Sequence, residues 1–139
     1  MLEKRKKKPK TKTLPALKKQ AWKLLSEVVR KEAVDIRGFC KCVTCGDWRF
    51  WNDRMQAGHA IGGRTAAVLF DEEIIYPQCV LCNIFKRGNY GEFAAFLIRK
   101  HGLEWYEKKV ETARKPAKLT RADVEEKIEN YKKRLEALG

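Results

Sequence analysis

The sequence lacks any long hydrophobic run. None of its apolar stretches is long enough for a signal peptide or a membrane-spanning helix, so no membrane partner is expected and the protein is predicted to be cytoplasmic. Because thiols are kept reduced in that compartment, disulfides are not expected among the five cysteines. The spacing of those cysteines favours metal binding instead.

Acidic residues are also scarce relative to basic ones. The 139 residues include 18 Asp and Glu against 31 Lys and Arg, which gives a formal charge of +13, far more than solubility requires. The first thirteen residues, MLEKRKKKPKTKT, hold seven basic residues and one acid, so the remaining 126 residues still carry +7. A polyanionic partner is therefore expected. Nucleic acid is the leading candidate, with an affinity that falls steeply with salt.

The chain divides into a basic arm and one domain. Residues 1–13 have too few apolar side chains to pack, so we expect a disordered arm; a solvated tail or a localisation signal is the alternative to a nucleic-acid role. Residues 14–139 suit a single domain with its own core and no internal repeat. Within it we expect a leading helix over 14–38, a metal-centred core over 39–89 and helices over 90–139.

Local signals predict the secondary structure of this domain. Pro15 marks a helix start and Gly38 a stop, while mixed aromatic and polar residues predict a strand, turn and strand, a β-hairpin, over residues 48–60. A short helix that opens at the second cysteine pair is expected to stop at Gly88. Gly102 then separates two further helices.

The last predicted helix carries an apolar stripe. Thr120 and Asp123 resemble a capping box that opens a helix running to Leu138. Apolar residues recur along it at spacings of four, three and four, at Val124, Ile128, Tyr131 and Leu135. Such a stripe packs either on its own domain or on a second copy of the chain.

Four of the five cysteines form two Cys-x-x-Cys pairs, Cys42 with Cys45 and Cys79 with Cys82. Two intervening residues let both sulfurs of a pair reach one tetrahedral zinc ion at about 2.3 Å. Because four thiolates leave no open position, this Zn²⁺ is expected to be structural, supplying folding free energy on the order of 10 kcal/mol. The alternative is separate buried or redox-active cysteines. Cys40 is then an alternative ligand or, more simply, a spare thiol.

A histidine and an asparagine accompany this cysteine framework. His59 lies between the pairs, in QAGHAIGGR, and Asn83 directly follows the second pair. This arrangement resembles the HNH, or ββα-metal, nucleases, in which a neutral imidazole takes a proton from water while a divalent cation neutralises charge on the phosphate. His59 would be the base, and the Asn83 oxygen would bind Mg²⁺ or Mn²⁺. Taken alone, Asn83 is also an ordinary helix cap, and His59 an ordinary surface or core residue.

The stretch from Cys42 to Asn89, with CVTCG, QAGHAIGGRTAAVLFDEE and PQCVLCNIFKRGN, resembles the NinG or Rap family of phage recombination endonucleases. The similarity extends less specifically over most of residues 14–138. The Cys-x-x-Cys-Asn element also resembles phage endonuclease VII, a junction resolvase in which the matching asparagine binds the catalytic metal. The resemblance implies an α+β fold, mostly α overall, with a zinc-stabilised ββα-metal core flanked by helices. It also implies hydrolysis of branched DNA, such as Holliday junctions and D-loops, by a phage or prophage protein in the host cell.

Two positions depart from the pattern of these enzymes. Many HNH nucleases place a metal-binding Asp directly before the base, where this sequence has Gly58. Asp71 is the candidate for a second oxygen ligand, although it and the following Glu72 and Glu73 also suit a solvated acidic loop. Ile74 stands where the family usually carries an asparagine that braces the base, and isoleucine cannot form that hydrogen bond.

Basic, amide and aromatic side chains near these motifs are candidates for contacts with DNA. Four residues are candidates for holding phosphates, with an ordinary charged surface as the alternative: Arg64, Lys86, Arg87 and Asn89. Three aromatic residues either stack on unpaired bases at a branch or form hairpin core: Trp48, Phe50 and Trp51. Because a branched junction has near two-fold symmetry, a homodimer would place one site on each of two strands.

The leading interpretation is a metal-dependent, structure-selective DNA endonuclease. The alternative from another class is a non-catalytic zinc-knuckle protein that binds DNA or acts as a scaffold, which Gly58 and Ile74 favour. Within the nucleases, an HNH enzyme of phage DNA packaging and a homing-type nuclease are competitors.

Overall fold

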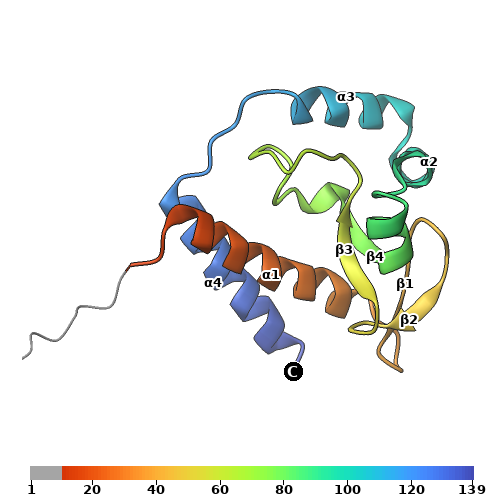
Figure 1. The fold of residues 1–139 in the computed structure, drawn as a ribbon, viewed down its shortest axis with the longest axis horizontal. Coiled ribbons are helices and arrows are strands. Elements are labelled where there is room, and N and C mark those ends of the chain that lie inside the picture. Colours follow the sequence, from red (N-terminus) through yellow and green to blue (C-terminus); the bar gives the residue numbers. More distant parts are fainter. Residues whose placement is uncertain (1–10) are drawn as a thin grey trace, which may run out of the picture.

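The computed structural model describes residues 11–139, so most of the expected basic arm lies outside the described residues. Its four α-helices are α1 (Leu14–Glu32), α2 (Tyr90–His101), α3 (Leu103–Ala113) and α4 (Arg121–Ala137). Two small antiparallel sheets pair β1 (Phe39–Lys41) with β2 (Trp48–Phe50) and β3 (Met55–His59) with β4 (Ile75–Cys79). Two short helical turns, η1 (Glu72–Ile74) and η2 (Leu81–Phe85), flank β4. The expected mixed and mainly helical composition is confirmed (Figure 1).

The first helix begins where its sequence predicts. The Thr13 hydroxyl accepts a hydrogen bond from the Ala16 amide at 3.3 Å, which satisfies one of the free amides of the first turn of α1. The Lys12 carbonyl accepts a hydrogen bond from Arg121 at 2.6 Å. Residues 11–13, which the sequence assigns to the arm, are therefore attached to the domain.

The same helix ends at Glu32, six residues before the predicted stop at Gly38. The cause is Asp35, whose carboxylate accepts hydrogen bonds from the backbone amides of Arg37 at 2.9 Å and Phe39 at 3.0 Å. A short acidic side chain that binds nearby amides competes with helical hydrogen bonding. Residues 33–38 therefore form a turn that leads into β1.

The main core lies between α1, α4 and the sheet of β3 and β4. The two helices lie side by side (Figure 1). Buried apolar residues come from one face of α1, at Leu17, Ala21, Leu25 and Val28, and from one face of α4, at Val124, Ile128 and Tyr131. The predicted stripe of the last helix thus packs on its own domain. The predicted capping box is also confirmed, because Thr120 and Asp123 exchange both hydrogen bonds, at 3.1 and 3.0 Å.

The predicted hairpin over residues 48–60 is wrong. Both strands exist, but β2 pairs with β1 and β3 pairs with β4, with His59 opposite Ile75. Between them the chain turns at Arg54, which has a left-handed backbone (φ 54°) and whose carbonyl accepts a hydrogen bond from Val80 at 3.0 Å. This turn directs β3 away from β2 and towards the strand that carries Cys79.

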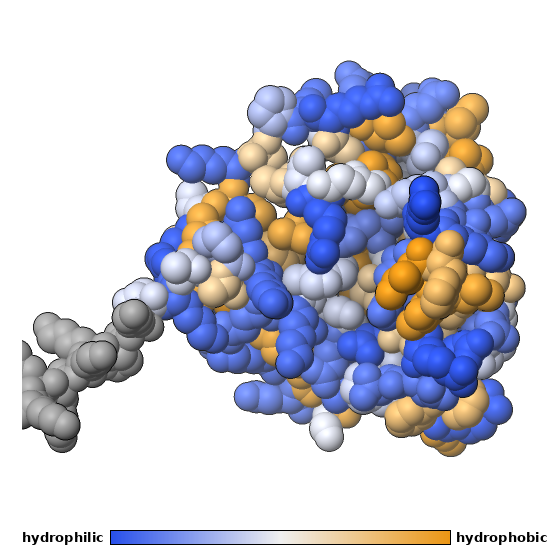
Figure 2. Space-filling model, in the orientation of Figure 1, coloured by the Kyte–Doolittle hydropathy of each residue, from blue (hydrophilic) through white to orange (hydrophobic). Residues whose placement is uncertain are grey.

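The remaining helices follow the prediction. The backbone of Gly102 has φ 93°, a conformation that favours glycine, and it separates α2 from α3. Hydrophilic side chains predominate on the face shown in Figure 2, with apolar patches between them. Within residues 11–139, no helix combines the length and apolar character needed to cross a membrane.

Candidate functional site

The four paired cysteines meet beside β1, β4 and η2. All of their sulfurs, from Cys42, Cys45, Cys79 and Cys82, lie within 4.8 Å of one another, and the Cys45 and Cys79 sulfurs are 3.7 Å apart. Four sulfurs arranged tetrahedrally around zinc at about 2.3 Å would be about 3.8 Å apart. The donor set and its spacing therefore fit zinc. Cys40 is buried but is not a member of this group.

Hydrogen bonds to the sulfurs support this cluster. The Thr44 hydroxyl lies 3.3 Å from the Cys42 sulfur, and the Asn89 side-chain amide donates to the Cys82 sulfur at 3.6 Å. Burial opposes ionisation of Cys42, but the Thr44 hydroxyl and nearby backbone amides outweigh it and lower the pKa of this thiol to about 6. Such partners orient metal ligands and stabilise the thiolate form. Asn89, a candidate DNA contact, thus faces the cysteine cluster.

His59 and Asn83 line the same cavity. His59 is the last residue of β3 and Asn83 lies in η2; with Trp22, Gln56 and Arg64 they border a cavity of about 390 Å³. Two of the clustered cysteines lie at the end of β4 and within η2. The cluster therefore fixes η2 next to the strand pair that presents the histidine.

The imidazole of His59 is held by two groups. Its Nε2 atom lies 3.0 Å from the Leu69 carbonyl oxygen, and its ring stacks on Trp22 with centroids 4.6 Å apart and an angle of 23°. Because a carbonyl only accepts, Nε2 must carry the proton, so Nδ1 of the neutral ring keeps its lone pair. The asparagine expected at position 74 is thus not the brace here. Ile74 is buried in the core.

The surroundings of His59 keep its ring neutral. Burial lowers the pKa of His59 below its usual value of 6.5, and the charge of Arg64 lowers it further. The Leu69 carbonyl and Asp71 act in the opposite direction without cancelling the shift. Near pH 7 the imidazole is therefore mostly unprotonated, as a general base requires.

Asn83 is oriented by a second amide in the cavity. Its Nδ2 atom donates to Gln56 Oε1 at 2.8 Å, and within residues 11–139 no hydrogen bond occupies its own carbonyl oxygen. Of the residues that the structure describes, those lining the cavity include no carboxylate. A hard cation would therefore find neutral oxygens here and would need further oxygen ligands from another molecule.

Asp71, the candidate second metal ligand, does not line this cavity. One carboxylate oxygen accepts from the Glu73 amide at 3.1 Å and caps η1, while the other pairs with Lys109 of α3 at 3.0 Å. Burial opposes the charge of Lys109, but its hydrogen bonds to Asp71 and Glu73 outweigh that effect and raise its pKa. The structure thus places Asp71 in an ion pair between the β3–β4 loop and α3.

The side chain of Gln78 on β4 explains why position 58 is a glycine. A Cβ atom at this position would collide with the side chain of Gln78, meeting its Oε1 and lying 3.0 Å from its Cδ. Gln78 is fully buried, and its Nε2 donates to the Thr44 hydroxyl at 3.1 Å and to the Gly88 carbonyl at 2.7 Å. It thereby links the first cysteine turn to the end of the second. An aspartate before the histidine would not fit.

The other candidate DNA contacts occupy different environments. Arg64 is exposed at the cavity, with its guanidinium 5.3 Å from the centroid of Trp22. Lys86 and Arg87 are exposed in the turn after η2 and do not line the cavity.

The three aromatic residues near β2 differ in their exposure to solvent. Trp48 and Phe50 remain 50% and 44% exposed. Trp51 packs against the cysteine cluster and lies under Arg30, whose guanidinium is 5.2 Å from its ring centroid. Trp51 is therefore core, and the other two stay available at the surface.

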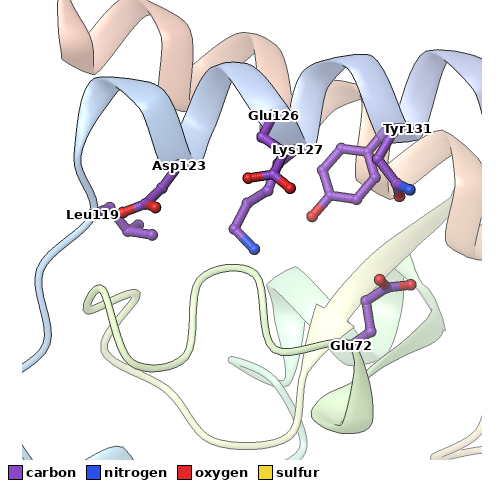
Figure 3. Close-up of a pocket in the computed structure, with 7 residues that line it drawn as sticks. Glu72, Leu119, Asp123, Glu126, Lys127 and Tyr131 are labelled. Atoms are coloured by element: carbon purple, nitrogen blue, oxygen red, sulfur yellow. The ribbon is translucent and has the colours of Figure 1, made fainter.

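A second cavity has the opposite charge. About 400 Å³ in volume, it lies between α4 and the segment that carries Glu72, with Asp123 and Glu126 among its lining residues. Figure 3 shows Asp123, Lys127 and Tyr131 projecting from α4 towards that segment. A carboxylate-lined cavity repels phosphates, so it does not compete as a nucleic-acid site.

Three residues that shape the site are not among those identified from the sequence. Trp22 is 37 positions from the histidine on which it stacks, Gln56 is an ordinary polar strand residue, and Gln78 stands in a strand next to a proline. Their roles arise from tertiary contacts. Only Gln78, a polar residue directly before a cysteine pair, could have prompted a search for a buried partner.

Comparisons with known proteins find both a family model and individual relatives that match the chain. The family model described as Bacteriophage Lambda NinG protein matches residues 1–139. The chain is 33% identical to Protein ninG of Salmonella phage P22 over 86 residues, which is 61% of this chain and 39% of that protein. Protein ninG of Escherichia phage 933W is 33% identical over 87 residues, 62% of this chain and 40% of that protein. The matches therefore span about two fifths of these relatives. No solved structure matches the chain significantly.

The cysteine cluster predicts one bound zinc per chain. Cys82→Ser should lose the ion and most of the folded structure, because zinc binding supplies a large part of the folding free energy. Cys40→Ala should keep one zinc, since that sulfur lies outside the cluster. Metal analysis of the purified proteins, together with circular dichroism, measures both. One equivalent of zinc in Cys82→Ser would contradict the assignment.

Gly58→Ala should destabilise the fold by about 1–3 kcal/mol, because the added methyl group displaces buried Gln78. The matched control is Gly91→Ala in α2, where an added Cβ meets nothing within 4 Å. That change should be neutral or stabilise by up to about 1 kcal/mol. Urea unfolding of both variants gives the comparison. Equal stabilities would show that Gln78 does not impose the glycine.

Proposed function

Because the chain belongs to the family of the bacteriophage lambda NinG protein, we propose that it is a metal-dependent, structure-selective DNA endonuclease of the HNH type. Its substrates would be branched recombination intermediates such as Holliday junctions and D-loops. Hydrolysis of the phosphodiester would leave a 5′-phosphate and a free 3′-hydroxyl.

The observation that carries this proposal is the shared cavity of His59 and Asn83. A strand pair, β3 and β4, is followed directly by η2, and the cysteine cluster lies at their junction. This order supports a ββα-metal arrangement. The two side chains that the chemistry requires come from β3 and η2 and face the same space.

His59 and Asn83 would have different roles in the reaction. His59 Nδ1 would accept a proton from the attacking water, because Nε2 is committed to the Leu69 carbonyl. Asn83 would offer its free carbonyl oxygen to a divalent cation. Mg²⁺ or Mn²⁺, when bound, would stabilise charge on the phosphate and on the departing oxygen. Since no carboxylate of the described part of the chain lines the cavity, oxygens of the DNA phosphate would complete the cation's ligands.

Exposed apolar side chains on η2 and at the start of α2 support a preference for branched DNA. η2 and the start of α2 expose Leu81, Ile84, Phe85 and Tyr90, of which Phe85 is 74% exposed. Ile84 and Tyr90 also line the cavity. Aromatic and aliphatic side chains gain energy by stacking on unpaired bases, which a branch offers and a continuous duplex does not.

A second candidate function is a non-catalytic zinc protein that binds DNA or acts as a scaffold. The absence of any carboxylate among the residues lining the cavity favours it, because most hard-cation sites include at least one. The two functions differ in one result. A scaffold would bind junctions and leave them intact.

His59→Ala should abolish nicking of a four-way junction in Mg²⁺ or Mn²⁺ while leaving junction affinity within about twofold. The control is His101→Ala, the only other histidine, which is exposed and stacks on Trp105 outside the cavity. In the parent protein, the single-turnover rate should fall as the pH drops through the pKa of His59, below 6.5, because the base becomes protonated. Gel assays on a junction, a flap and a linear duplex measure these rates.

Two outcomes of these assays separate the candidates. A parent protein that binds junctions but cuts none of them with either cation supports the scaffold function and removes the nuclease proposal. Equal cutting of linear and branched DNA would favour a packaging or homing-type nuclease over a recombination enzyme.

Phe85→Ala should reduce the preference for a junction over linear duplex by about 5-fold to 150-fold, the scale of one lost stacking contact of about 1–3 kcal/mol. Cutting of the linear duplex should change little, since that substrate offers no unpaired base. The matched control is Leu138→Ala, an exposed apolar residue directly after α4. An unchanged junction preference in Phe85→Ala would remove this role.

A further inference from the structure

A groove along α1 leads into the cavity of His59. Two neighbouring cavities, of about 560 and 310 Å³, open on α1, and both share Trp22 with the first. Ser26 joins the larger one to the His59 cavity, and Arg64 joins the smaller one to it. The three cavities therefore adjoin one another around Trp22, and together they are called the groove here.

The charged side chains that line this groove are all cationic. Its cationic residues are Lys18, Lys19, Lys23, Arg30 and Arg64. Among residues 11–139, no aspartate or glutamate lines any of the three cavities. A groove that concentrates positive charge without nearby carboxylates raises the local concentration of an anionic partner.

Most of these cations are free to bind a ligand. Within the part of the chain that the structure describes, the side chains of Lys18, Lys19, Lys23 and Arg64 form no ion pair and donate no hydrogen bond. Arg30 differs, because its guanidinium is committed to the Trp51 and Met55 carbonyls and to Asn52. Burial lowers the pKa of Arg30 as well. Arg30 therefore closes one end of the groove and is not part of the ligand-binding set.

The free cations are arranged along the helix axis. Lys19 and Lys23 are both exposed and four residues apart, so they lie on one side of α1 with an axial separation of about 6 Å. The opposite side of this helix carries the buried residues of the core. Two cations on one helix face, next to a third on the β3–β4 loop, suit an extended polyanion rather than a small anion.

We propose that this groove binds the phosphate backbone of the DNA strand that enters the His59 cavity. The assignment deepens the proposed nuclease function by naming the path of its substrate, with Lys19, Lys23 and Arg64 as phosphate contacts. The acidic cavity on α4 shows that the charge of the domain is not uniform. Electrostatic attraction therefore directs DNA to the face that carries the groove.

Trp22 contacts both the groove and the expected catalytic base. It stacks on His59 and lies 5.3 Å from the Arg64 guanidinium, so one indole touches both the expected base and a phosphate contact. DNA held by the groove would therefore press on a residue that positions the imidazole. Trp22 is a positioning residue in this account and does not touch the reacting atoms.

The test is DNA binding by Lys19→Gln/Lys23→Gln, measured by fluorescence anisotropy on a labelled 30-base-pair duplex and a four-way junction without added divalent cation. The slope of log affinity against log salt should become shallower by about 1.8, because each lost contact removes about 0.9. At 0.15 M salt the affinity should fall about thirtyfold, which follows from the same slope. Lys19→Arg/Lys23→Arg should restore both values.

The matched control is Lys132→Gln/Lys133→Gln, which removes the same charge from α4 at residues that line none of the three cavities. Its salt slope should stay within about 0.5 of the parent value. Equal losses in the two double variants would overturn the groove, because only net charge would matter.

The groove and the nuclease can fail separately. Binding is measured without cleavage, so a chain that binds through Lys19 and Lys23 but never cuts keeps the groove and loses the proposed activity. A chain that cuts junctions and binds normally after Lys19→Gln/Lys23→Gln keeps the activity and loses the groove.

Discussion

The clustering of four cysteine sulfurs is the constraint on which the candidate site depends. It joins a turn after β1 to the end of β4 and the start of η2, segments more than thirty residues apart in the chain. Gln78 reinforces the same junction through two hydrogen bonds. A short helix of five residues would not hold its orientation alone. The cluster fixes it, and Asn83 faces the His59 cavity as a consequence.

The imidazole depends on a different set of contacts. α1 buries one face against α4 and presents Trp22 to His59 from another, so packing of the outer helices sets the position of the ring. The Leu69 carbonyl then selects which nitrogen carries the proton. These contacts replace the asparagine that the HNH pattern would place at position 74. The same helix carries the basic groove, so the proposed path of the DNA passes Trp22, which stacks on the expected base.

The sequence predicts the features that depend on interactions between residues close together in the chain. The cysteine spacing, the capping box at Thr120, the break at Gly102 and the apolar stripe of α4 each depend on residues a few positions apart, and the structure contains all of them. Strand pairing was not predictable in this way, because alternation identifies a strand but not its partner. The helix stop was missed because the Asp35 turn resembles helical sequence until its hydrogen bonds are known.

The roles of Gly58 and Asp71 also depend on residues that are distant in the sequence. Gly58 departs from the HNH pattern in sequence, yet the departure follows from Gln78, twenty positions away. Asp71 suggests a metal ligand until Lys109 is found beside it. Both are decided by neighbours that only the tertiary structure supplies.

The most direct test of the central claim is a crystal structure of the His59→Ala protein with a DNA junction and Mn²⁺, with anomalous scattering recorded separately for zinc and manganese. Zinc should lie among the four cysteines, and manganese should contact both Asn83 and a DNA phosphate in the His59 cavity. Junction DNA bound elsewhere, with Asn83 directed away from its phosphates, would contradict the account.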